Sequence, residues 1–386
     1  MKKPIYLDYN GTTPCAHEVV EAMKSFNEEN FGNPSSSHWY GIEPKRAVEK
    51  AREQVANLLQ CSPEEIIFTS GGTEANNHAI KGIALAMKDK GKHIITSAIE
   101  HPAVLEVCQS LDEFGFETTI LPVNNEGVVN TDDVKKAIRS ETILISIMHA
   151  NNEVGSIQPI AEIGEIAEKY NIVMHTDAAQ SIGKIPTVVD ELRVDLLSLA
   201  GHKLYAPKGV GALYVRYPIN LAKFCHGAGQ ERGRRAGTEN VAQIVGLGKA
   251  CELASINLQK HMAEMKMLRD RLYDKFTSDV TDVKLNGHPE QILPNTLNIS
   301  FKGLGANRIL KKIADDVAVS AGAACHSDTL HISHVLKAMD VQEEWAKGTL
   351  RFSVGRMTTI EQIDKAAEVV IAAVQEIRGS NISTSP

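Results

Sequence analysis

The sequence predicts an α/β fold with a large domain on a mostly parallel sheet and a smaller α+β domain. Short apolar runs, typical of buried strands, alternate with segments of helical periodicity. The run at 142–148, TILISIM, is almost entirely apolar, as expected of a strand covered on both faces. The 386 residues also exceed the usual size of one domain, which indicates about two or three domains.

Two patterns of apolar residues predict the strands and helices in the first two thirds of the chain. Strands are expected where short runs rich in apolar and β-branched residues end in a turn. Helices are expected where apolar residues recur three and four positions apart. The expected strands are 65–69, 93–97, 118–122, 142–148, 172–175, 196–199 and 211–215, and the expected helices are 45–59, one that starts in the turn at 71–77 and runs to about 87, 104–114 and 161–170.

A long charged helix at about 256–276, rich in Lys, Glu and Met, is expected to bridge to the second domain. The predicted large domain is 13–257. The predicted small domain combines 1–12 with 258–386 and carries a cysteine-bearing loop. In this part we expect strands at 296–301 and 317–320 and helices at 306–313, 333–339 and 360–377, before a small polar tail that frays.

Composition narrows the class of protein. Hydrophobic residues make up 43% and charged residues 23%, as in ordinary soluble proteins, and the net charge of -7 argues against a general nucleic-acid or membrane-surface binder. The start has no apolar signal region, and no apolar run reaches the roughly 18 residues of a membrane span. The six cysteines have no metal-ligand spacing, so neither a zinc site nor a disulfide framework is expected. We expect a cytoplasmic protein.

Lys203 is the most informative residue. It follows an expected strand in the run Ser-Leu-Ala-Gly-His-Lys, and Asp177 ends the strand before it. A lysine amine can hold the aldehyde of pyridoxal 5'-phosphate as a Schiff base, and a carboxylate can keep its pyridinium nitrogen protonated. Either residue alone is more simply a surface lysine or a strand-end Asp. Together they favour a pyridoxal phosphate enzyme, with the large domain binding the cofactor.

Three turns could complete such a site. Gly72 and Thr73 lie between a strand and a helix, where backbone amides and a helix N-terminus bind anions. His101 follows a strand end and could stack on a ring or move protons. Asn152 follows the most apolar strand, at the edge where ligands bind in parallel sheets. Each also has a purely structural interpretation as a turn residue, and the glycine turn alone is weak evidence.

Three further segments favour contacts with charged or reactive groups. The glycine-punctuated basic segment 227–240 could bind phosphate or carboxylate, although a solvated loop is the simpler alternative. Cys325 lies among small residues beside His326, which favours a reactive thiolate over a structural cysteine. Arg351 alternates with apolar neighbours on an expected strand, and its guanidinium suits a substrate carboxylate.

These motifs, in this order, resemble the NifS/IscS-type cysteine desulfurases of the class V aminotransferase family, which are fold-type I enzymes. The resemblance runs from the segment YLDYNGTT at 6–13 to Arg356. It implies that Lys203 binds the cofactor, Asp177 pairs with its pyridinium nitrogen and His101 stacks on its ring. By the same resemblance, Gln180 and Asn152 contact the ring hydroxyl, and Thr73 and His202 bind the phosphate. Thr238 binds the phosphate held by the other subunit of a homodimer. Asn33 and Arg351 bind the substrate carboxylate.

The resemblance also implies a reaction: L-cysteine becomes L-alanine, and its sulfur passes to Cys325 as a persulfide and then to an acceptor such as an iron–sulfur scaffold protein. The spacing from Cys325 to Val335 matches the long-loop IscS-like group. Three features depart from the common patterns. Ala200 replaces a serine before Gly-His-Lys, and the loop reads AGAACHSD, which resembles animal selenocysteine lyases, although Pro102 does not fit that group.

Three alternatives stay open on sequence alone. The nearest is a selenocysteine lyase acting on L-selenocysteine. A second is another enzyme of this fold, such as an aminotransferase or kynureninase, because one fold hosts many reactions. A third is a non-catalytic binding protein built on an inactive enzyme. Cys325 argues against the first two, and the joint presence of Lys203, Asp177 and His101 argues against the third.

Overall fold

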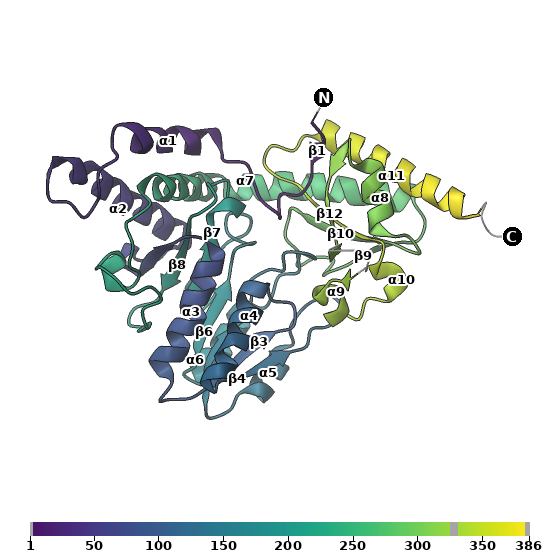
Figure 1. Ribbon diagram of the computed structural model, residues 1–386. Helices are drawn as coiled ribbons and strands as arrows, with labels where there is room; N and C mark the ends of the chain where they lie inside the picture. The colour runs from purple at the N-terminus through teal and green to yellow at the C-terminus, as the bar shows by residue number, and fades with distance from the viewer. Residues whose placement is uncertain (1–2, 325–330, 383–386) are drawn as a thin grey trace.

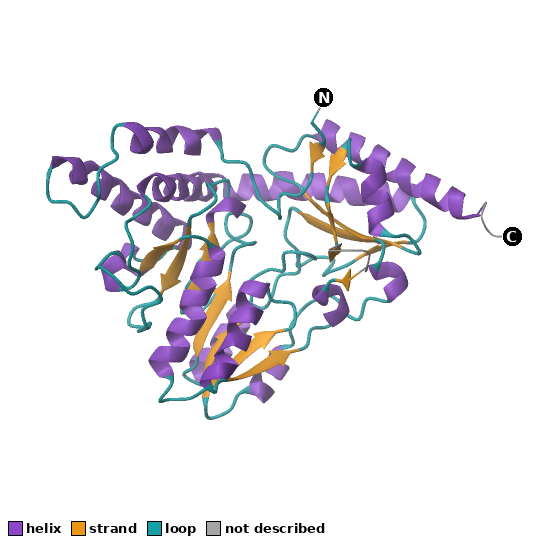
Figure 2. Cartoon of the chain, in the orientation of Figure 1, coloured by secondary structure: helices purple, strands orange, loops and turns teal. Residues whose placement is uncertain are grey.

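The computed structural model describes residues 3–324 and 331–382. Its centre is a seven-stranded sheet in the order β2-β8-β7-β6-β5-β3-β4, flanked by helices (Figure 2). Strand β8 is antiparallel to both of its neighbours, and the other neighbouring pairs are parallel. The predicted α/β class is confirmed. The strands are β2 (Ile66–Thr69), β3 (His93–Ser97), β4 (Glu117–Leu121), β5 (Thr142–Ser146), β6 (Val173–Asp177), β7 (Leu196–Ala200) and β8 (Gly211–Val215).

Both faces of this sheet are buried, because neighbouring residues along a strand point to opposite sides. Ile94 and Leu196 pack in one hydrophobic core, whereas the next residues, Ile95 and Leu197, pack in another. The first core is covered by α3 (Gly72–Met87) and α4 (Pro102–Leu111). The second is covered by α1 (His17–Glu28), α2 (Trp39–Leu59), α6 (Ile160–Lys169) and the first half of α7 (Val241–Asp279), with α5 (Thr131–Ala137) beside α6.

A second, antiparallel sheet has the order β12-β15-β10-β9 and its own hydrophobic core. Helix α7 connects the two sheets (Figure 1): Ala254 packs in the core of the large sheet and Met265 in that of the second. The remaining elements are β1 (Ile5–Tyr6), β9 (Val283–Leu285), β10 (Thr296–Phe301), α8 (Ala306–Ile313), β11 (Val317–Ala318), β12 (Ser320–Ala321), β13 (Ala323–Ala324), β14 (His331–Ile332), α9 (His334–Ala338), α10 (Glu343–Ala346), β15 (Thr349–Ser353) and α11 (Ile360–Ile382).

The N-terminal segment belongs with the second sheet although it begins the chain. Strand β1 pairs in parallel with β11, so that Ile5 lies opposite Val317, and Asp8 forms a bridge with Ser353. From there the chain crosses to the large sheet, where Thr13 donates to the carbonyl of His202. Residues 8–13 therefore lie between the two sheets. Within the described part of the chain, no helix is both long and apolar enough to cross a membrane.

A buried ion pair anchors the basic segment at 227–240. Arg52 on α2 donates to both carboxylate oxygens of Glu231, at 2.8 and 3.1 Å, and its guanidinium lies 4.7 Å from the centre of the Phe68 ring. The Phe68 amide also donates to Glu231, at 3.0 Å. Both charged side chains are buried, with 6% and 3% of their surface exposed. This pair fixes where the segment leaves the core of the large sheet.

We expect Glu231→Ala to lower the free energy of unfolding by about 3–5 kcal/mol, because it leaves the Arg52 guanidinium buried without its counter-charge. Urea unfolding measures this loss. The exposed pair Arg139–Glu117 offers a matched control, and Glu117→Ala should cost less than about 1 kcal/mol. Equal losses in the two variants would contradict an anchoring role for the buried pair.

Candidate active site

A cavity of about 250 Å³ lies at the carboxyl-terminal edge of the parallel strands, where ligands bind in sheets of this kind. The turns after β3, β5, β6 and β7, the start of α3, the N-terminal segment and β15 surround it. Most of the predicted site residues meet here. The cavity is lined by Asn10, Gly11, Gly72, Thr73, Asn76, His101, Ala103, Met148, Ala150, Asn152, Asp177, Ala179, Gln180, Ala200, His202, Lys203 and Arg351.

Lys203 enters the cavity from a 3₁₀ turn, Gly201–Lys203, that directly follows β7. Its ammonium donates to the backbone carbonyls of Asn10 and Gly11, the latter at 2.8 Å. Burial and the positive charge of Arg351 lower the pKa of Lys203 to about 8, against the opposing charges of Asp8 and Asp177. The amine is therefore much closer to its nucleophilic, unprotonated form near neutral pH than an exposed lysine.

Asp177 ends β6 with a buried carboxylate whose position is fixed by two donors. Asn76 Nδ2 on α3 donates to one oxygen at 2.7 Å, and the Ala179 amide donates to the other at 2.8 Å. The Oδ1 atom of Asn76 is buried and has no partner among the described residues. A buried polar atom in this state calls for a ligand or a water to satisfy it.

His101 caps the N-terminus of α4: its Nδ1 accepts a hydrogen bond from the Ala103 amide at 3.0 Å. An acceptor Nδ1 carries no proton, so the neutral ring has its proton on Nε2. Burial lowers the pKa of His101, Asp177 opposes this effect, and the charges of Lys203 and His334 add to it. The cavity therefore contains a neutral imidazole whose orientation is set by the helix cap.

Gln180 is oriented by two residues that the sequence did not single out. Its Oε1 accepts from Lys184 Nζ at 2.8 Å, and its Nε2 donates to the Asn10 carbonyl at 3.0 Å. Lys184 is fully enclosed, and burial holds its pKa well below that of an ordinary lysine. Because Lys184 occupies the amide oxygen, Gln180 presents its N–H groups toward Asn10 and the cavity.

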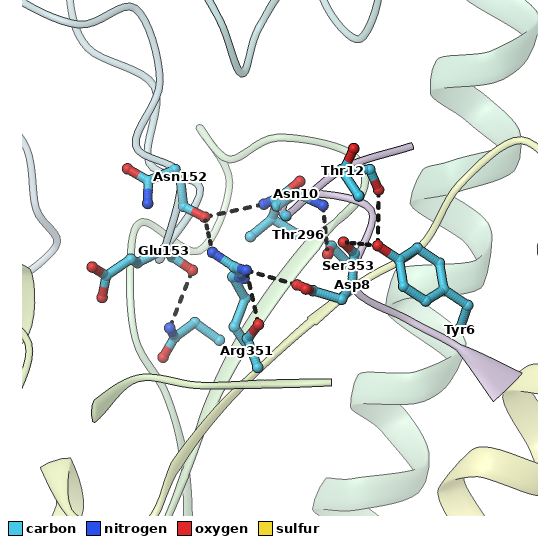
Figure 3. A network of polar contacts seen from close by, with 12 residues as sticks. Tyr6, Asp8, Asn10, Thr12, Asn152, Glu153, Thr296, Arg351 and Ser353 are labelled. Atoms are coloured by element: carbon cyan, nitrogen blue, oxygen red, sulfur yellow. Dashed lines mark hydrogen bonds and ion pairs between the residues drawn. The ribbon is translucent and has the colours of Figure 1, made fainter. Parts of the chain in front are cut away.

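Arg351 lies on β15 and is held by three acceptors (Figure 3). It donates to the Asn152 carbonyl at 3.0 Å, to the Asp8 carboxylate at 2.7 Å and to Ser320 Oγ at 3.1 Å. Its Nε is buried and has no partner among the described residues. Asn10 joins the same network through the Asn152 carbonyl and Thr296. The guanidinium is preorganised, and its Nε–H is not used by any described residue.

The part of the cavity lined by the start of α3 suits an anion. Gly72 and Thr73 form the first turn of α3, whose backbone N–H groups are free to bind an anion. A Cβ atom on Gly72 would lie 3.1 Å from the Cβ of Ala200, a tight contact, so a glycine lets the start of α3 lie against Ala200 without displacing it. His202 Nδ1 lies 3.1 Å from Thr12 Oγ1. Burial, with the neighbouring positive charges of Lys203, Lys208 and Lys184, lowers the pKa of His202 to about 4.

Three predicted residues are not among those that line the cavity. Asn33 is exposed, and its side chain accepts from the Ser35 amide at 2.9 Å. Thr238 is exposed in the segment anchored by Glu231. Cys325 lies outside the described residues. Both Asn33 and Thr238 were assigned roles from the resemblance alone, and one of those roles involves a second copy of the chain.

Comparison with known proteins gives one consistent result. The family model described as aminotransferase class-V matches residues 5–366. Cysteine desulfurase IscS of Dictyoglomus turgidum is 51% identical over 379 residues, which cover 98% of this chain and 96% of that protein. A solved NifS-like protein superimposes with a TM-score of 0.91 at 38% identity, covering 96% and 99% of the two chains. Another solved structure, described as SspA in complex with cysteine, superimposes with a TM-score of 0.80 at 38% identity, covering 93% of this chain and 100% of that one.

Proposed function

The chain belongs to the aminotransferase class-V family, and on this premise we propose that it is a cysteine desulfurase that forms L-alanine from L-cysteine. One observation carries the proposal: Lys203, Asp177, His101 and Arg351 line the same cavity. The selenocysteine lyase alternative is not favoured, because the near full-length relatives described above are named cysteine desulfurase or NifS-like protein.

Pyridoxal 5'-phosphate is the proposed cofactor, and the side chains of the cavity fit it. Lys203 would hold its aldehyde covalently, Asp177 would pair with its ring nitrogen, and the first turn of α3 would hold its phosphate. The unpartnered Asn76 Oδ1 supports a polar ligand beside Asp177. When bound, the cofactor supplies an electron sink for the charge left on the substrate Cα.

The remaining residues are given the roles that the family resemblance implies, and Asn33 and Thr238 lie outside the cavity lining of one chain. Neutral His101 would lie against the ring, while Gln180 Nε2 and Asn152 would contact its hydroxyl. His202 and Thr73 would bind the phosphate together with Thr238 of a second copy in a homodimer. Arg351, with its free Nε, would bind the substrate carboxylate with Asn33. Lys203 would remove the Cα proton and return it, since its pKa of about 8 suits both steps.

The proposed sulfur transfer needs no outside oxidant. The Cys325 thiolate attacks the substrate sulfur, so an S–S bond forms while the Cβ–S bond breaks and its electron pair stays on carbon. Cys325 is oxidised to a persulfide, and Cβ is reduced and takes up one proton, equivalent to the one lost when the Cys325 thiolate formed, to become the methyl group of alanine. A thiol reductant or an acceptor protein, such as an iron–sulfur scaffold, then removes the persulfide sulfur.

The domain boundaries and the cytoplasmic location stay predictions. Two separate cores support a large domain at 13–257 and a small domain built from 1–12 and 258–386. Leu7 packs in the small core and Tyr9 in the large one, close to the proposed first boundary.

Alanine release from L-cysteine and from L-selenocysteine, measured side by side with a thiol reductant, tests the proposed function. Release from both substrates is expected, with the cysteine reaction dependent on Cys325. Release from L-selenocysteine alone would overturn the desulfurase assignment.

The pH dependence of cofactor binding provides a separate prediction. Only the unprotonated Lys203 amine attacks the cofactor aldehyde, so the loading rate of apoenzyme should rise about tenfold per pH unit and level off near pH 8. Arg351→Gln should move this levelling to higher pH, because the Arg351 charge helps to lower the Lys203 pKa. The same rate, measured for free N-acetyl-lysine and the cofactor over the same pH range, corrects for titration of the cofactor itself. A profile unchanged by Arg351→Gln would contradict the electrostatic coupling.

A further inference from the structure

Helix α9 packs directly on the turns that form the cavity. Val335 and Leu336 of α9 share a small hydrophobic core with Ile99, Met148 and Val154. Ile99 is two residues before His101, Met148 lines the cavity, and Val154 is two residues after Asn152. The position of α9 is therefore set by the same turns that place the site residues.

Two polar contacts fix the start of α9 on those turns. Ser333, the N-cap of α9, donates its hydroxyl to Glu153 Oε2 at 2.6 Å and accepts from the Val335 amide at 3.0 Å. His334 Nε2 lies 3.0 Å from the Glu100 carbonyl, so Nε2 carries the proton of this hydrogen bond. One contact reaches the turn of Asn152, and the other reaches the turn of His101.

Both acceptors belong to stiff turns. The amides of Glu153 and Val154 donate to Asn151 Oδ1 at 2.8 and 3.0 Å. The Glu100 carboxyl is fully buried and accepts from Ser97 at 2.7 Å and from the Met148 amide at 2.9 Å. These bonds join the ends of β3 and β5 and fix the backbone of the two turns from which Glu153 and Glu100 hold Ser333 and His334.

The same residues form the base of the segment that contains Cys325. Ser333 donates its amide to the Gly322 carbonyl, and β13 pairs with β14 directly beyond them. On the other side, Ser320 accepts a hydrogen bond from Arg351. Chain connectivity therefore joins Cys325 to two points that are tied to the cavity lining, one at Ser320 and one at Ser333.

We propose that Glu153 is a positioning residue for sulfur transfer: by holding Ser333, it fixes the base of the Cys325 segment relative to the cavity. Glu153 acts through Ser333 and touches no reacting group. The proposal rests on the proposed desulfurase function. It predicts that Glu153 affects the step that needs the thiol and leaves the Cα proton transfer of Lys203 intact.

Glu153→Leu tests this with two reactions of the holoenzyme. Alanine formation from L-cysteine needs Cys325, whereas exchange of the Cα proton of L-alanine in D2O needs only Lys203 and the cofactor. We expect kcat for alanine formation to fall about 10- to 100-fold, because a misplacement of about 1 Å costs rates of this order. Exchange should change by less than about twofold. Amide exchange in α9 should become faster, which reports the lost contact directly.

Two variants act as controls. Glu153→Gln keeps an oxygen acceptor for Ser333 and should restore most of the cysteine activity. Asn130→Ala removes a comparable cap from α5, where Asn130 accepts from the Asp132 amide at 2.8 Å, and should leave both reactions unchanged. If Glu153→Leu does not fold, Ser333→Ala removes the same contact, and Ser333→Thr is its conservative partner.

The outcomes separate the positioning role from the function itself. Equal loss of both reactions would show that Glu153 shapes the cavity as a whole. Unchanged alanine formation would show that its contact with Ser333 does not affect sulfur transfer. Either result overturns the positioning role while the wild-type enzyme still releases alanine from L-cysteine. A wild-type enzyme that releases no alanine would instead overturn the proposed function.

Discussion

Lys203→Ala is expected to abolish alanine formation from L-cysteine, a loss of at least about 10³-fold. The variant loses both the amine that would hold the cofactor and the base that would move the Cα proton, and general base catalysis alone contributes about 10²–10⁴-fold. No other described lysine takes its place, because Lys184 is occupied by Gln180 and Asn10. Steady-state alanine release and the absorbance of the lysine-bound cofactor measure the two losses separately.

Lys90→Ala is the control for this experiment. Lys90 is exposed and does not line the cavity, so its loss should leave turnover near the wild-type value. Retained alanine formation in Lys203→Ala would overturn the assignment of the site. Lys203→Arg should be as inactive as Lys203→Ala, since it keeps the positive charge but provides no free amine.

Cys325→Ala is expected to abolish desulfuration of L-cysteine while leaving Cα proton exchange of L-alanine intact. The thiol is the proposed acceptor of sulfur, and alanine forms only when the electron pair of the Cβ–S bond stays on carbon, which requires a nucleophile to take the sulfur. Cleavage of L-selenocysteine should fall less, because selenium leaves more easily. Alanine release from both substrates, with proton exchange by NMR, gives the three rates from one protein preparation.

Cys15→Ala is the control for general loss of thiols. Cys15 is only partly exposed, and burial raises its pKa, so its thiolate is scarce at neutral pH. This variant should retain full activity with both substrates. Turnover of L-cysteine by Cys325→Ala at the wild-type rate would refute the role of Cys325 as acceptor.

The strands and helices predicted most accurately are those whose apolar residues follow one clear spacing. Strands β3, β8 and β10 and helix α8 begin and end at the predicted residues. Helix α7 was expected from about 256 but begins at Val241. Its start was missed because the first half of the helix is buried and apolar and lacks the one-sided apolar pattern of a surface helix. Helices α1 and α5 were not predicted. Helix α5 has only seven residues, and α1 begins at His17 without a side-chain cap, so a start signal is missing.

Site residues were predicted where the type of side chain determines the chemistry. They were missed where their role depends on the backbone or on burial. Lys203, Asp177, His101 and Arg351 stand out because few other residue types suit a covalent, pairing or carboxylate-binding role. Asn10 was missed because its carbonyl accepts from Lys203, and any residue has a carbonyl. Asn76, Lys184 and Glu100 were missed because their importance depends on burial, which a single sequence does not reveal at isolated polar positions.

The pairing of β1 with β11 has a consequence for the order in which the protein is made. The segment that carries the Asn10 and Gly11 carbonyls is held in place by Val317 and Ser353, which are synthesised more than 300 residues after it. At about 5–20 residues per second, the first segment waits roughly 15 to 70 s for its partners. The Lys203 pocket is thus completed only after Ser353 has emerged, and a translation product that stops before this residue cannot assemble it.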